Sequence, residues 1–529
     1  MAKAQKNRAS KTSYVSPNQL EFVGFESPFT RHLDANNRWV KLSKQIPWDK
    51  IANVYRKQLN NSITGADGIN PRVAIGAIFI KHICDLSDRE TVDQIQENIY
   101  MQYFIGYSSF SYEPVFDPSL FVDLRKRFGA EQINEINETI MGLVSKEQED
   151  KKEVAPSQDK TAEVESLDVK QSKEPTQQAI QEIPIEPPEN KGNLIVDATA
   201  CPQDISYPTD LNLLNDSREK AEELIDFLYN PSRHDKKPRT YRENARKVYL
   251  KTAQKKKKTK KEIRVAIRKQ LGFLKRDIKG IYKLLDSFEK MPFNPRQYKY
   301  FLVIQTLYDQ QEKMYREKIH SIEHRIVSIH QPHVRPIVRG KTNANVEFGA
   351  KIQMSIMNGI TFLEDLSWEA FNEGARLIST VENYKRRFGC YPQKVFADKI
   401  YCTRDNRAKL KERKIILVAK PLGRPSLAVD NHIRPGERNP IEGKFGQAKT
   451  AYGMNRIKAR LSDTSESWIA SIVLVLNLIK LIGRVPVSLF IKLYEKYVAS
   501  QYPILHNFKI SILKKLVFLP KPTKTADPN

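Results

Sequence analysis

The most informative stretch of this chain is Arg438-Asn-Pro-Ile-Glu442-Gly-Lys-Phe-Gly-Gln-Ala-Lys449. Asparagine followed by proline is typical of a helix start, so we expect a helix to begin near Asn439. Glu442 and Lys449 are then almost two turns apart and lie on nearly the same face. Arg438 precedes the cap and can point the same way. The stretch therefore predicts one helical carboxylate flanked by two cations.

Two aspartates far upstream each close an apolar, strand-like segment. Asp197 follows Asn-Leu-Ile-Val, and Asp398 follows Lys-Val-Phe-Ala. We expect each to lie at the end of a strand, which fixes a side chain better than a loop does. Asp204 and Asp210 compete with Asp197 because they are close to it in the sequence. Asp197 is preferred because it ends the strand.

Two aspartates and a glutamate suit divalent-metal chemistry on a phosphodiester. Mg²⁺ prefers carboxylate oxygens, and two ions roughly 4 Å apart can stabilise both the attacking and the leaving oxygen. We therefore expect Asp197, Asp398 and Glu442 to hold two Mg²⁺ ions, for which Mn²⁺ can substitute. Each carboxylate also has a plainer explanation. An aspartate often begins a turn, and Glu442 fits the third position of a helix capping box.

Composition points to nucleic acid as the partner. The 529 residues hold 88 Lys and Arg against 62 Asp and Glu, a net charge of +26, and nucleic acid is the default acidic partner. The four cysteines show no metal-ligand spacing, which argues against structural zinc and suits a reducing cytosol. We expect a cytoplasmic protein without membrane contact, because no signal-peptide pattern is present and the apolar stretch Trp468–Ile482 is shorter than a span of roughly 20 residues.

Changes in composition divide the chain into four parts. We expect a helical N-terminal domain at 1–145, a flexible linker at 146–190, an α/β domain at 191–485 and a basic tail at 486–529. The linker is rich in Lys, Glu, Gln, Ser and Pro and holds no aromatic residue. It therefore buries too little apolar surface to offset the entropy of ordering.

Three helix starts mark the N-terminal domain. Asn70-Pro71 opens the first helix, the capping box Ser87-Asp-Arg-Glu90 opens the second, and Asp117-Pro118 opens the third. These helices are candidates to contact DNA bases, with Arg125-Lys-Arg127 at the end of the third. The segment at about 105–116 is too long for a tight helix-turn-helix, and a basic helix end is also what the helix dipole favours.

Strands alternate with helices through the α/β domain. Two apolar runs, Val346–Ile356 and Ile360–Leu366, are joined by Asn358-Gly359, the strongest short hairpin signal. Further elements are expected at these places: helices near 371–388 and 403–413, a buried strand at 415–419 and a buried core helix at Trp468–Ile482. This alternation indicates an α/β core with a mixed sheet flanked by helices.

A helical segment at about 211–325 interrupts the α/β pattern. Residues 251–270 contain ten Lys or Arg and one acidic residue. Apolar residues at helical spacing begin within this stretch and continue to Leu285. A proline turn separates this helix from a second one that runs to Ile326. The pattern predicts an inserted helical hairpin. We expect its lysine run to contact DNA phosphates, although a solvated face is the alternative; the run includes Lys255, Lys256, Lys257 and Lys258.

The run Arg438-x3-Glu442-x6-Lys449, together with Asp197 and Asp398, resembles the signature of bacterial insertion-sequence transposases of the Asp-Asp-Glu class. Further segments share the likeness: Asp197-Ala-Thr, Glu347-Phe-Gly-Ala-Lys351, Asn372-Glu-Gly374, Asp398-Lys-Ile-Tyr401 and Leu86-Ser-Asp-Arg-Glu90. Two positions depart from the family pattern. Pro435 stands where the signature usually has Tyr, and Ile400 where many members have Gly. Neither departure removes a metal ligand.

The resemblance implies a ribonuclease-H-like catalytic domain preceded by an all-α domain. It implies metal ligation by Asp197, Asp398 and Glu442, and contacts to DNA or phosphate from Arg438 and Lys449. The basic continuation through Arg456 extends the same face.

The implied activity is DNA transposition. Such an enzyme binds the terminal inverted repeats of its element, cleaves the ends by metal-dependent hydrolysis and joins the 3′ ends to target DNA. We expect a homodimer on double-stranded DNA, associated with a bacterial nucleoid. Two alternatives stay open: a non-catalytic DNA-binding regulator derived from such an enzyme, and a metal-dependent structure-specific nuclease.

Overall fold

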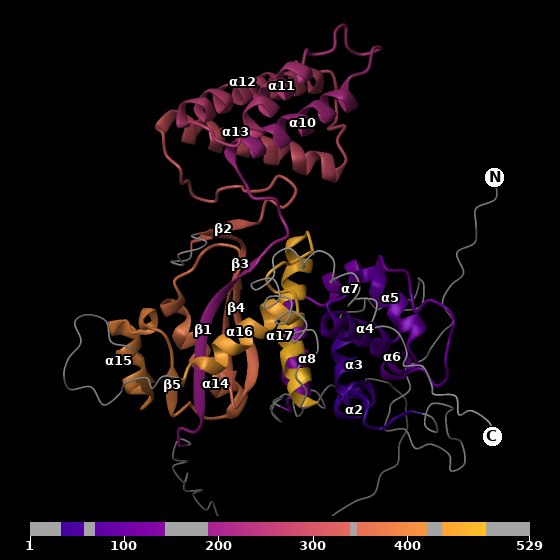
Figure 1. Cartoon of the computed structure of the whole chain (residues 1–529), viewed down its shortest axis with the longest axis vertical. Helices are drawn as coiled ribbons and strands as arrows, with labels where there is room; N and C mark the ends of the chain where they lie inside the picture. Colours follow the sequence, from indigo (N-terminus) through magenta and orange to yellow (C-terminus); the bar gives the residue numbers. More distant parts are fainter. Residues whose placement is uncertain (1–32, 58–68, 143–188, 339–345, 420–435, 483–529) are drawn as a thin grey trace, which may run out of the picture.

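The structure is a computed structural model that describes residues 33–57, 69–142, 189–338, 346–419 and 436–482. The described residues form a block of N-terminal helices, a mixed sheet with helices on its faces, and a separate group of four helices beyond one end of the sheet (Figure 1). The expected basic tail and almost all of the expected linker lie outside these residues.

The sheet contains six strands in the order β2-β3-β1-β5-β6, with β4 also paired to β3. The strands are β1 (Asn193–Pro202), β2 (Arg335–Val338), β3 (Val346–Met357), β4 (Ile360–Ser367), β5 (Lys394–Phe396) and β6 (Ile416–Val418). β1 pairs antiparallel with β3 and parallel with β5. The predicted hairpin is confirmed: Asn358 and Gly359 join β3 to β4 with φ of 51° and 77°, as a tight hairpin turn requires.

β1 continues past Asp197, so the expectation that this aspartate ends its strand is wrong. β1 stays paired with β3 as far as Pro202, and Asp197 lies opposite Met354 in the middle of the strand. On the other edge of β1, pairing with β5 stops at Ile195. Asp398 does follow the end of its strand, as predicted. The open edge of β1 therefore begins where Asp197 and Asp398 lie.

Helices cover both faces of the sheet. They are α14 (Leu377–Phe388), α15 (Arg404–Glu412), α16 (Asn439–Ala451) and α17 (Ser462–Leu481), with short 3₁₀ helices η1 (Glu373–Arg376) and η2 (Lys399–Tyr401). On one face Leu194 and Val196 of β1 pack with Val381 of α14. On the other face Ile352 of β3 belongs to the same buried cluster as Ile441 of α16. Packing on these two faces of the sheet therefore holds helix α16 in a fixed position relative to strand β1.

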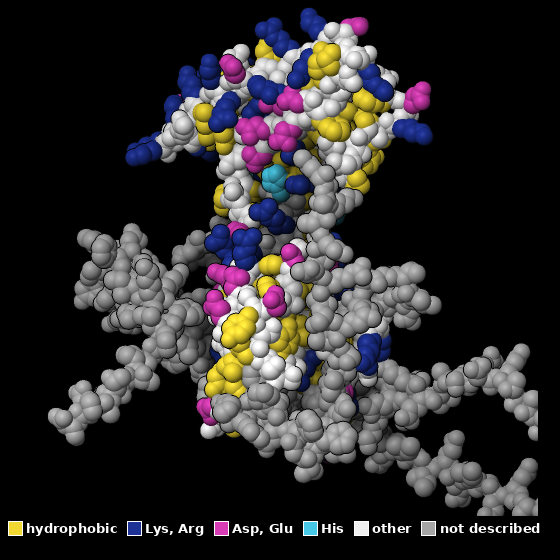
Figure 2. All heavy atoms as spheres, turned by 90° about the vertical axis from the view of Figure 1, so that its right-hand side faces the viewer, with side chains coloured by type: hydrophobic (Ala, Val, Ile, Leu, Met, Phe, Trp, Pro, Cys, Tyr) yellow, Lys and Arg dark blue, Asp and Glu magenta, His cyan; other side chains and the backbone are white. Residues whose placement is uncertain are grey.

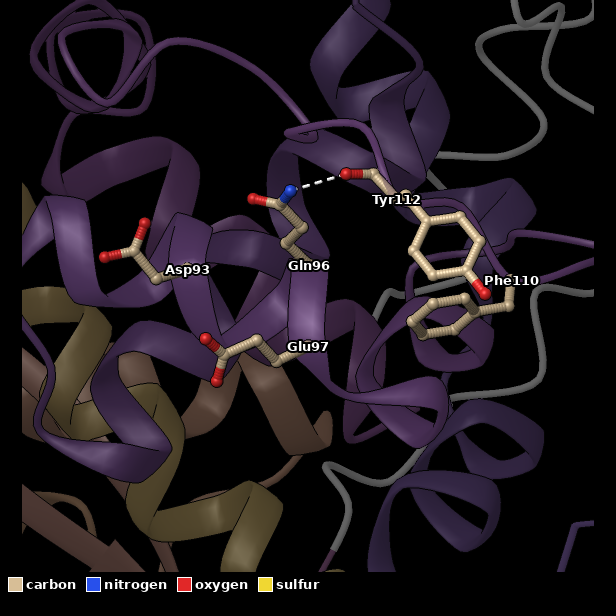
Figure 3. A pocket seen from close by; sticks show the side chains of 5 residues that line it. All are labelled: Asp93, Gln96, Glu97, Phe110 and Tyr112. Carbon is tan, nitrogen blue, oxygen red and sulfur yellow. Dashed lines mark hydrogen bonds between the residues drawn. The ribbon is translucent and has the colours of Figure 1, made fainter.

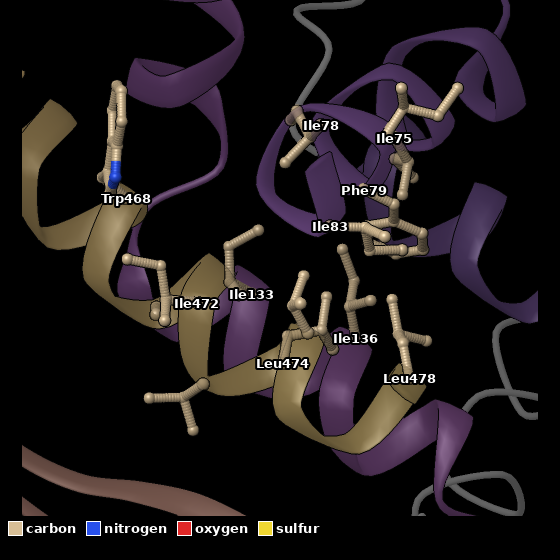
Figure 4. Packing of buried hydrophobic residues seen from close by; sticks show 14 of the residues in the cluster. Ile75, Ile78, Phe79, Ile83, Ile133, Ile136, Trp468, Ile472, Leu474 and Leu478 are labelled. Carbon is tan, nitrogen blue, oxygen red and sulfur yellow. The ribbon is translucent and has the colours of Figure 1, made fainter. Parts of the chain in front are cut away.

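Helix α17 joins the sheet to the N-terminal helices in one hydrophobic core (Figure 4). Those helices are α2 (Arg38–Gln45), α3 (Trp48–Arg56), α4 (Pro71–Cys84), α5 (Asp88–Glu97), α6 (Ile99–Phe104), α7 (Leu120–Arg127) and α8 (Ala130–Ile140). The sequence predicted three of them, and the capping box of Ser87 and Glu90 is confirmed. Among the described residues, α17 alone is long and apolar enough to cross a membrane, and 83% of its apolar window is buried inside the protein. The prediction of a buried core helix is confirmed.

The inserted segment forms four helices, not the two of the predicted hairpin. They are α10 (Asp210–Leu228), α11 (Arg242–Ala253), α12 (Lys260–Leu285) and α13 (Pro295–Glu317). They enclose a hydrophobic core of their own that shares no residue with the other clusters. α13 ends earlier than expected because Lys318 adopts the left-handed conformation, with φ of 58°. Lys255 to Lys258 lie in the loop before α12, and not on a helix as expected.

Candidate metal and DNA site

Three of the predicted site residues meet at the open edge of β1. Nη2 of Arg438 donates to Oδ2 of Asp197 at 3.0 Å, and Nη1 of the same guanidinium lies 3.3 Å from Oδ1 of Asp398. Arg438 and Asp197 are 18% and 17% exposed, whereas Asp398 is 54% exposed. One arginine therefore bridges two carboxylates that are 201 residues apart in the sequence, as the numbers 398 and 197 show.

The backbone fixes the orientation of both carboxylates. Oδ1 of Asp197 accepts a hydrogen bond from the amide of Ala198 at 2.9 Å. Oδ1 of Asp398 accepts from the amide of Lys399 at 2.7 Å, which caps η2. Each aspartate is thus oriented by the element that carries it, and the second oxygen of Asp197, Oδ2, is the one that accepts from Arg438.

The electrostatics of Asp197 favour a neighbouring cation. Burial raises the pKa of the Asp197 carboxyl, and the negative charges of Glu373 and Asp398 raise it further, while Arg438 opposes them. Burial also raises the pKa of the Tyr401 hydroxyl, which has no hydrogen-bond partner among the described residues. The site is therefore a buried concentration of negative charge that a cation would stabilise.

Glu442 lies in the first turn of α16, one helical turn beyond Arg438, and its side chain is exposed. Four residues advance a helix by roughly 6 Å, which separates Glu442 from Arg438 along the helix axis. Within the described ranges, however, no group of three or more His, Cys, Asp or Glu side chains is arranged to hold a metal ion. The structure thus brings together the two aspartates and Arg438, but not the complete carboxylate trio.

The donor atoms at this site fit Mg²⁺ in kind. Asp197 and Asp398 offer hard carboxylate oxygens on adjacent central strands, and Mg²⁺ needs only one or two carboxylates besides water and phosphate oxygens. The guanidinium that bridges them marks a place where positive charge is accommodated. The N-terminus of α16, just after Arg438, adds the positive end of a helix dipole, which favours a phosphate group and not the metal ion.

Glu373 is a neighbour of the site to which the sequence assigned no role. It lies on η1 next to η2, where Asn406 holds the two short helices together by donating to the carbonyls of Gly374 and Tyr401 at 2.8 and 3.0 Å. Lys351 of β3 forms an ion pair with Glu373 at 2.9 Å. The only sequence signal for it was the segment Asn372-Glu-Gly374 in the family resemblance.

The competing aspartates are engaged elsewhere. Asp204 pairs with Nε of Arg456 at 2.9 Å, and Asp210 pairs with Arg325 at 2.7 Å near the base of the four-helix group. Neither lies with Asp398. The preference for Asp197 is therefore supported by geometry, although its reason, the strand end, was not correct.

The other basic residues predicted to bind DNA lie away from the aspartates. Lys449 is half-buried in the last turn of α16. Lys255 pairs with Glu262 at the start of α12, and Lys256, Lys257 and Lys258 are exposed in the preceding loop. Figure 2 shows Lys and Arg side chains spread over the outer surface of the four-helix group. These positions suit contacts to a long duplex, not to the reacting phosphate.

One basic residue of the N-terminal helices that was considered for DNA contact is buried. Arg125, at the end of α7, is 5% exposed and donates both terminal nitrogens to Asp88 at 2.8 and 2.7 Å, so the expectation that it contacts DNA is wrong. A hollow of about 410 Å³ on this block is lined by Asp93, Gln96, Glu97, Phe110 and Tyr112 (Figure 3). Its two carboxylates, Asp93 and Glu97, would repel phosphate.

Two segments of the chain match models of protein families. Residues 27–127 match a family described as "Transposase domain (DUF772)", and residues 395–479 match one described as "Transposase DDE domain". The first segment covers the helices up to α7, and the second contains Asp398, Arg438 and Glu442. Asp197 lies outside both.

One curated relative and no solved structure match the chain. The relative, described as "Uncharacterized protein ORF8 in nfe locus" of Rhizobium meliloti, is 33% identical over 101 residues, which are 18% of this chain and 46% of that protein. The chain thus spans less than half the length of this relative. No solved structure matches. The two family matches support a transposase function in general.

Proposed function

We propose that this chain is a DNA transposase of the Asp-Asp-Glu class, whose Asp197, Asp398 and Glu442 hold divalent metal against the phosphodiester to be cut. The observation that supports this most is the meeting of Asp197, Asp398 and Arg438 at one edge of the sheet from three distant segments. The transposase likeness of residues 395–479 agrees with it, because that segment holds three of the four residues named here.

The strand arrangement supports a ribonuclease-H-like catalytic unit. β1 lies between an antiparallel neighbour, β3, and a parallel neighbour, β5. Asp197 lies on β1, Asp398 follows β5, and Glu442 lies in the first turn of α16, which packs on one face of the sheet. A central strand, its parallel neighbour and a following helix then each supply one carboxylate.

Each residue has a distinct role in the proposed reaction. Bound Mg²⁺ supplies Lewis-acid stabilisation of the attacking and leaving oxygens. Asp197 and Asp398 keep the orientation that their backbone hydrogen bonds set. Arg438 has two terminal nitrogens suited to phosphate oxygens, and Lys449 and Arg456 extend the positive surface along the duplex.

The remaining parts of the chain fit a larger DNA complex. We propose that the lysine loop Lys255–Lys258 contacts phosphates of the element's end, and that exposed positions of the N-terminal helices, such as Lys126 and Arg127, position the duplex. A homodimer would cut both ends together. The protein would act on the nucleoid in the cytoplasm. A regulator that only binds DNA is the alternative, because Glu442 does not reach the aspartates in this structure.

Magnesium-dependent cleavage of a supercoiled plasmid tests the proposal. The plasmid carries the DNA that flanks this gene on both sides, and the full chain is compared with Asp398→Asn and Glu442→Gln. We expect cuts at the element's ends, reduced at least about 100-fold in both variants, because each metal contributes several kcal/mol to the transition state. Asp405→Asn is the matched control, since Asp405 is an exposed aspartate that pairs with Lys409 in its own helix.

Two outcomes would count against the enzyme assignment. Specific binding to the flanking DNA without any cutting, in Mg²⁺ or Mn²⁺, would favour the regulator. Cutting that persists in both variants would show that other residues hold the metal.

A further inference from the structure

Arg438 occupies the position between the two aspartates where positive charge is needed. Its two terminal nitrogens reach different carboxylates, at 3.0 Å to Asp197 and 3.3 Å to Asp398, so the guanidinium bridges the pair and does not bind one partner alone. Its third nitrogen, Nε, is buried and has no hydrogen-bond partner among the described residues. The arginine is thus held by these two ion pairs and gains nothing further from the protein through Nε.

The backbone of Arg438 is fixed, whereas its side chain has an alternative position. Arg438 immediately precedes α16, and α16 is anchored in the core by Ile441 and Ala448, both 0% exposed. Asp398 on the far side of the guanidinium is 54% exposed, so solvent reaches the site from that direction. An arginine side chain can therefore swing outward by rotating its own bonds, without moving the helix.

We infer that Arg438 is a built-in counter-cation of the Asp197–Asp398 pair in the DNA-free protein, which a divalent metal ion must displace. This inference rests on the proposed function, because it takes the two aspartates to be the metal site. A carboxylate oxygen engaged by a guanidinium is a poorer metal ligand, so the arginine competes directly with the ion for the same oxygens.

The competition couples metal binding to DNA binding. A phosphate of the duplex offers the displaced guanidinium a new partner of the same charge type as the aspartates. DNA that takes Arg438 away from the aspartates raises their affinity for metal, and by linkage metal raises the affinity for DNA. The site would then load its metal in the presence of its substrate and stay largely inert without it.

Metal binding to the full chain without DNA tests the inference. Calorimetric titration with Mn²⁺ compares the wild type with Arg438→Gln, which has a shorter polar side chain without charge. We expect the variant to bind Mn²⁺ roughly tenfold more tightly, within the usual range of coupling between sites. The matched control is Arg325→Gln, because Arg325 also pairs with a partly buried aspartate, Asp210, but far from the site. Its Mn²⁺ affinity should equal that of the wild type.

Further variants and a titration with DNA distinguish the possible explanations of the result. If Arg438→Gln does not fold, as judged by circular dichroism, Arg438→Lys replaces it, and an ammonium that reaches one carboxylate at a time should give an intermediate gain. Adding a duplex oligonucleotide should tighten Mn²⁺ binding in the wild type but not in Arg438→Gln. Equal Mn²⁺ affinities of wild type and Arg438→Gln, or equal effects of DNA on both, would overturn the inference. If Asp398→Asn leaves Mn²⁺ binding unchanged, the metal site itself is misassigned and the proposed function fails instead.

Discussion

Asp277 is a carboxylate that the four-helix group buries without a hydrogen-bond partner. It lies on α12 and is 1% exposed, and neither of its oxygens is hydrogen-bonded within the described residues. Burial, together with the nearby Glu222, raises the pKa of Asp277 to about 8, although the surrounding arginines oppose the shift. The folded protein therefore keeps Asp277 protonated at neutral pH, whereas the unfolded chain ionises it above about pH 4.

The stability of the four-helix group should consequently fall as the pH rises from about 4 to about 8. In this range the unfolded state has released the Asp277 proton and the folded state has not, so each pH unit costs up to about 1.4 kcal/mol. We expect Asp277→Asn to remove this contribution, so that wild type loses about 3–4 kcal/mol more than the variant between pH 5 and pH 8. Urea unfolding at the two pH values measures the difference.

Asp286→Asn is the control for this prediction, because Asp286 is exposed at the end of the same helix. It should follow the wild type at both pH values. If Asp277→Asn loses as much stability as the wild type between pH 5 and pH 8, Asp277 is ionised in the folded protein and the assignment is incorrect.

At the scale of elements, Asn477 has a structural reason to interrupt the apolar run Ile472–Ile479 of helix α17. Nδ2 of Asn477 donates to Oδ1 of Asn137 on α8 and to the carbonyl of Thr361 on β4, both at 2.8 Å, and Oδ1 of Asn477 accepts from the amide of Thr361 at 2.8 Å. All three residues are buried. One side chain therefore fastens α17 to both the sheet and the N-terminal helices, and it satisfies backbone groups of β4 that face no further strand there.

Asn477→Ala should lower the free energy of unfolding by about 3 kcal/mol. The substitution leaves the amide of Thr361 and Oδ1 of Asn137 without their hydrogen-bond partner Asn477, and each such buried group costs about 1–3 kcal/mol. Denaturant unfolding monitored by far-ultraviolet circular dichroism measures the loss. Lys480→Ala is the control on the same helix, because the Lys480 ammonium bonds to the Asn358 carbonyl at an exposed site. It should change stability by no more than about 0.5 kcal/mol, and a loss as large as that of Asn477→Ala would contradict the buried-network explanation.

The sequence predicted those elements whose signals are local. The capping box at Ser87 and the Asn358-Gly359 turn were found because their hydrogen bonds and dihedral angles involve residues within a few positions of each other. The end of α13 was missed because the apolar period continues through Ile319 and Ile322, although Lys318 has left the helical conformation. Continuation of a pattern does not show where tertiary contacts stop supporting a helix.

The sequence predicted which residues belong to the candidate site, but not how those residues are arranged in space. The residues Asp197, Asp398 and Arg438 were each selected, yet the sequence assigned Arg438 to DNA and not to the aspartates, because a contact across 241 residues has no local signal. Asp197 was placed at a strand end since Ala198 to Pro202 are not strongly β-forming by composition. They are nevertheless a strand because β3 pairs with them. Contacts with residues distant in the sequence therefore determine both the partner of Arg438 and the length of β1.

At the scale of the whole molecule, the hydrophobic clusters divide the chain into units that differ from the domains predicted from sequence composition. The N-terminal helices, α16, α17 and one face of the sheet share one cluster, whereas the four-helix group has a separate one. Ion pairs strengthen the contact between the N-terminal helices and the sheet domain, since Arg386 and Arg387 of α14 both bind Glu138 of α8, at 2.6 and 2.7 Å. The N-terminal helices and the sheet should therefore unfold together, and the inserted helices by themselves.

Leu474→Ala and Leu274→Ala test this division, because both leucines are 0% exposed and lie in the first and second cluster respectively. Each substitution should cost about 2–5 kcal/mol in its own cluster. In hydrogen-exchange mass spectrometry, Leu474→Ala should accelerate exchange in α4 and α8 as well as in β3 and β4, and leave α12 and α13 at the wild-type rate. Leu274→Ala should do the reverse. If Leu474→Ala accelerated exchange only in the sheet, α17 would not couple the N-terminal helices to the sheet, and these helices could then change position on the sheet without unfolding of either part. The expected joint response would instead mean that any DNA held by the N-terminal helices is fixed relative to Asp197 and Asp398, while the four-helix group can adjust separately.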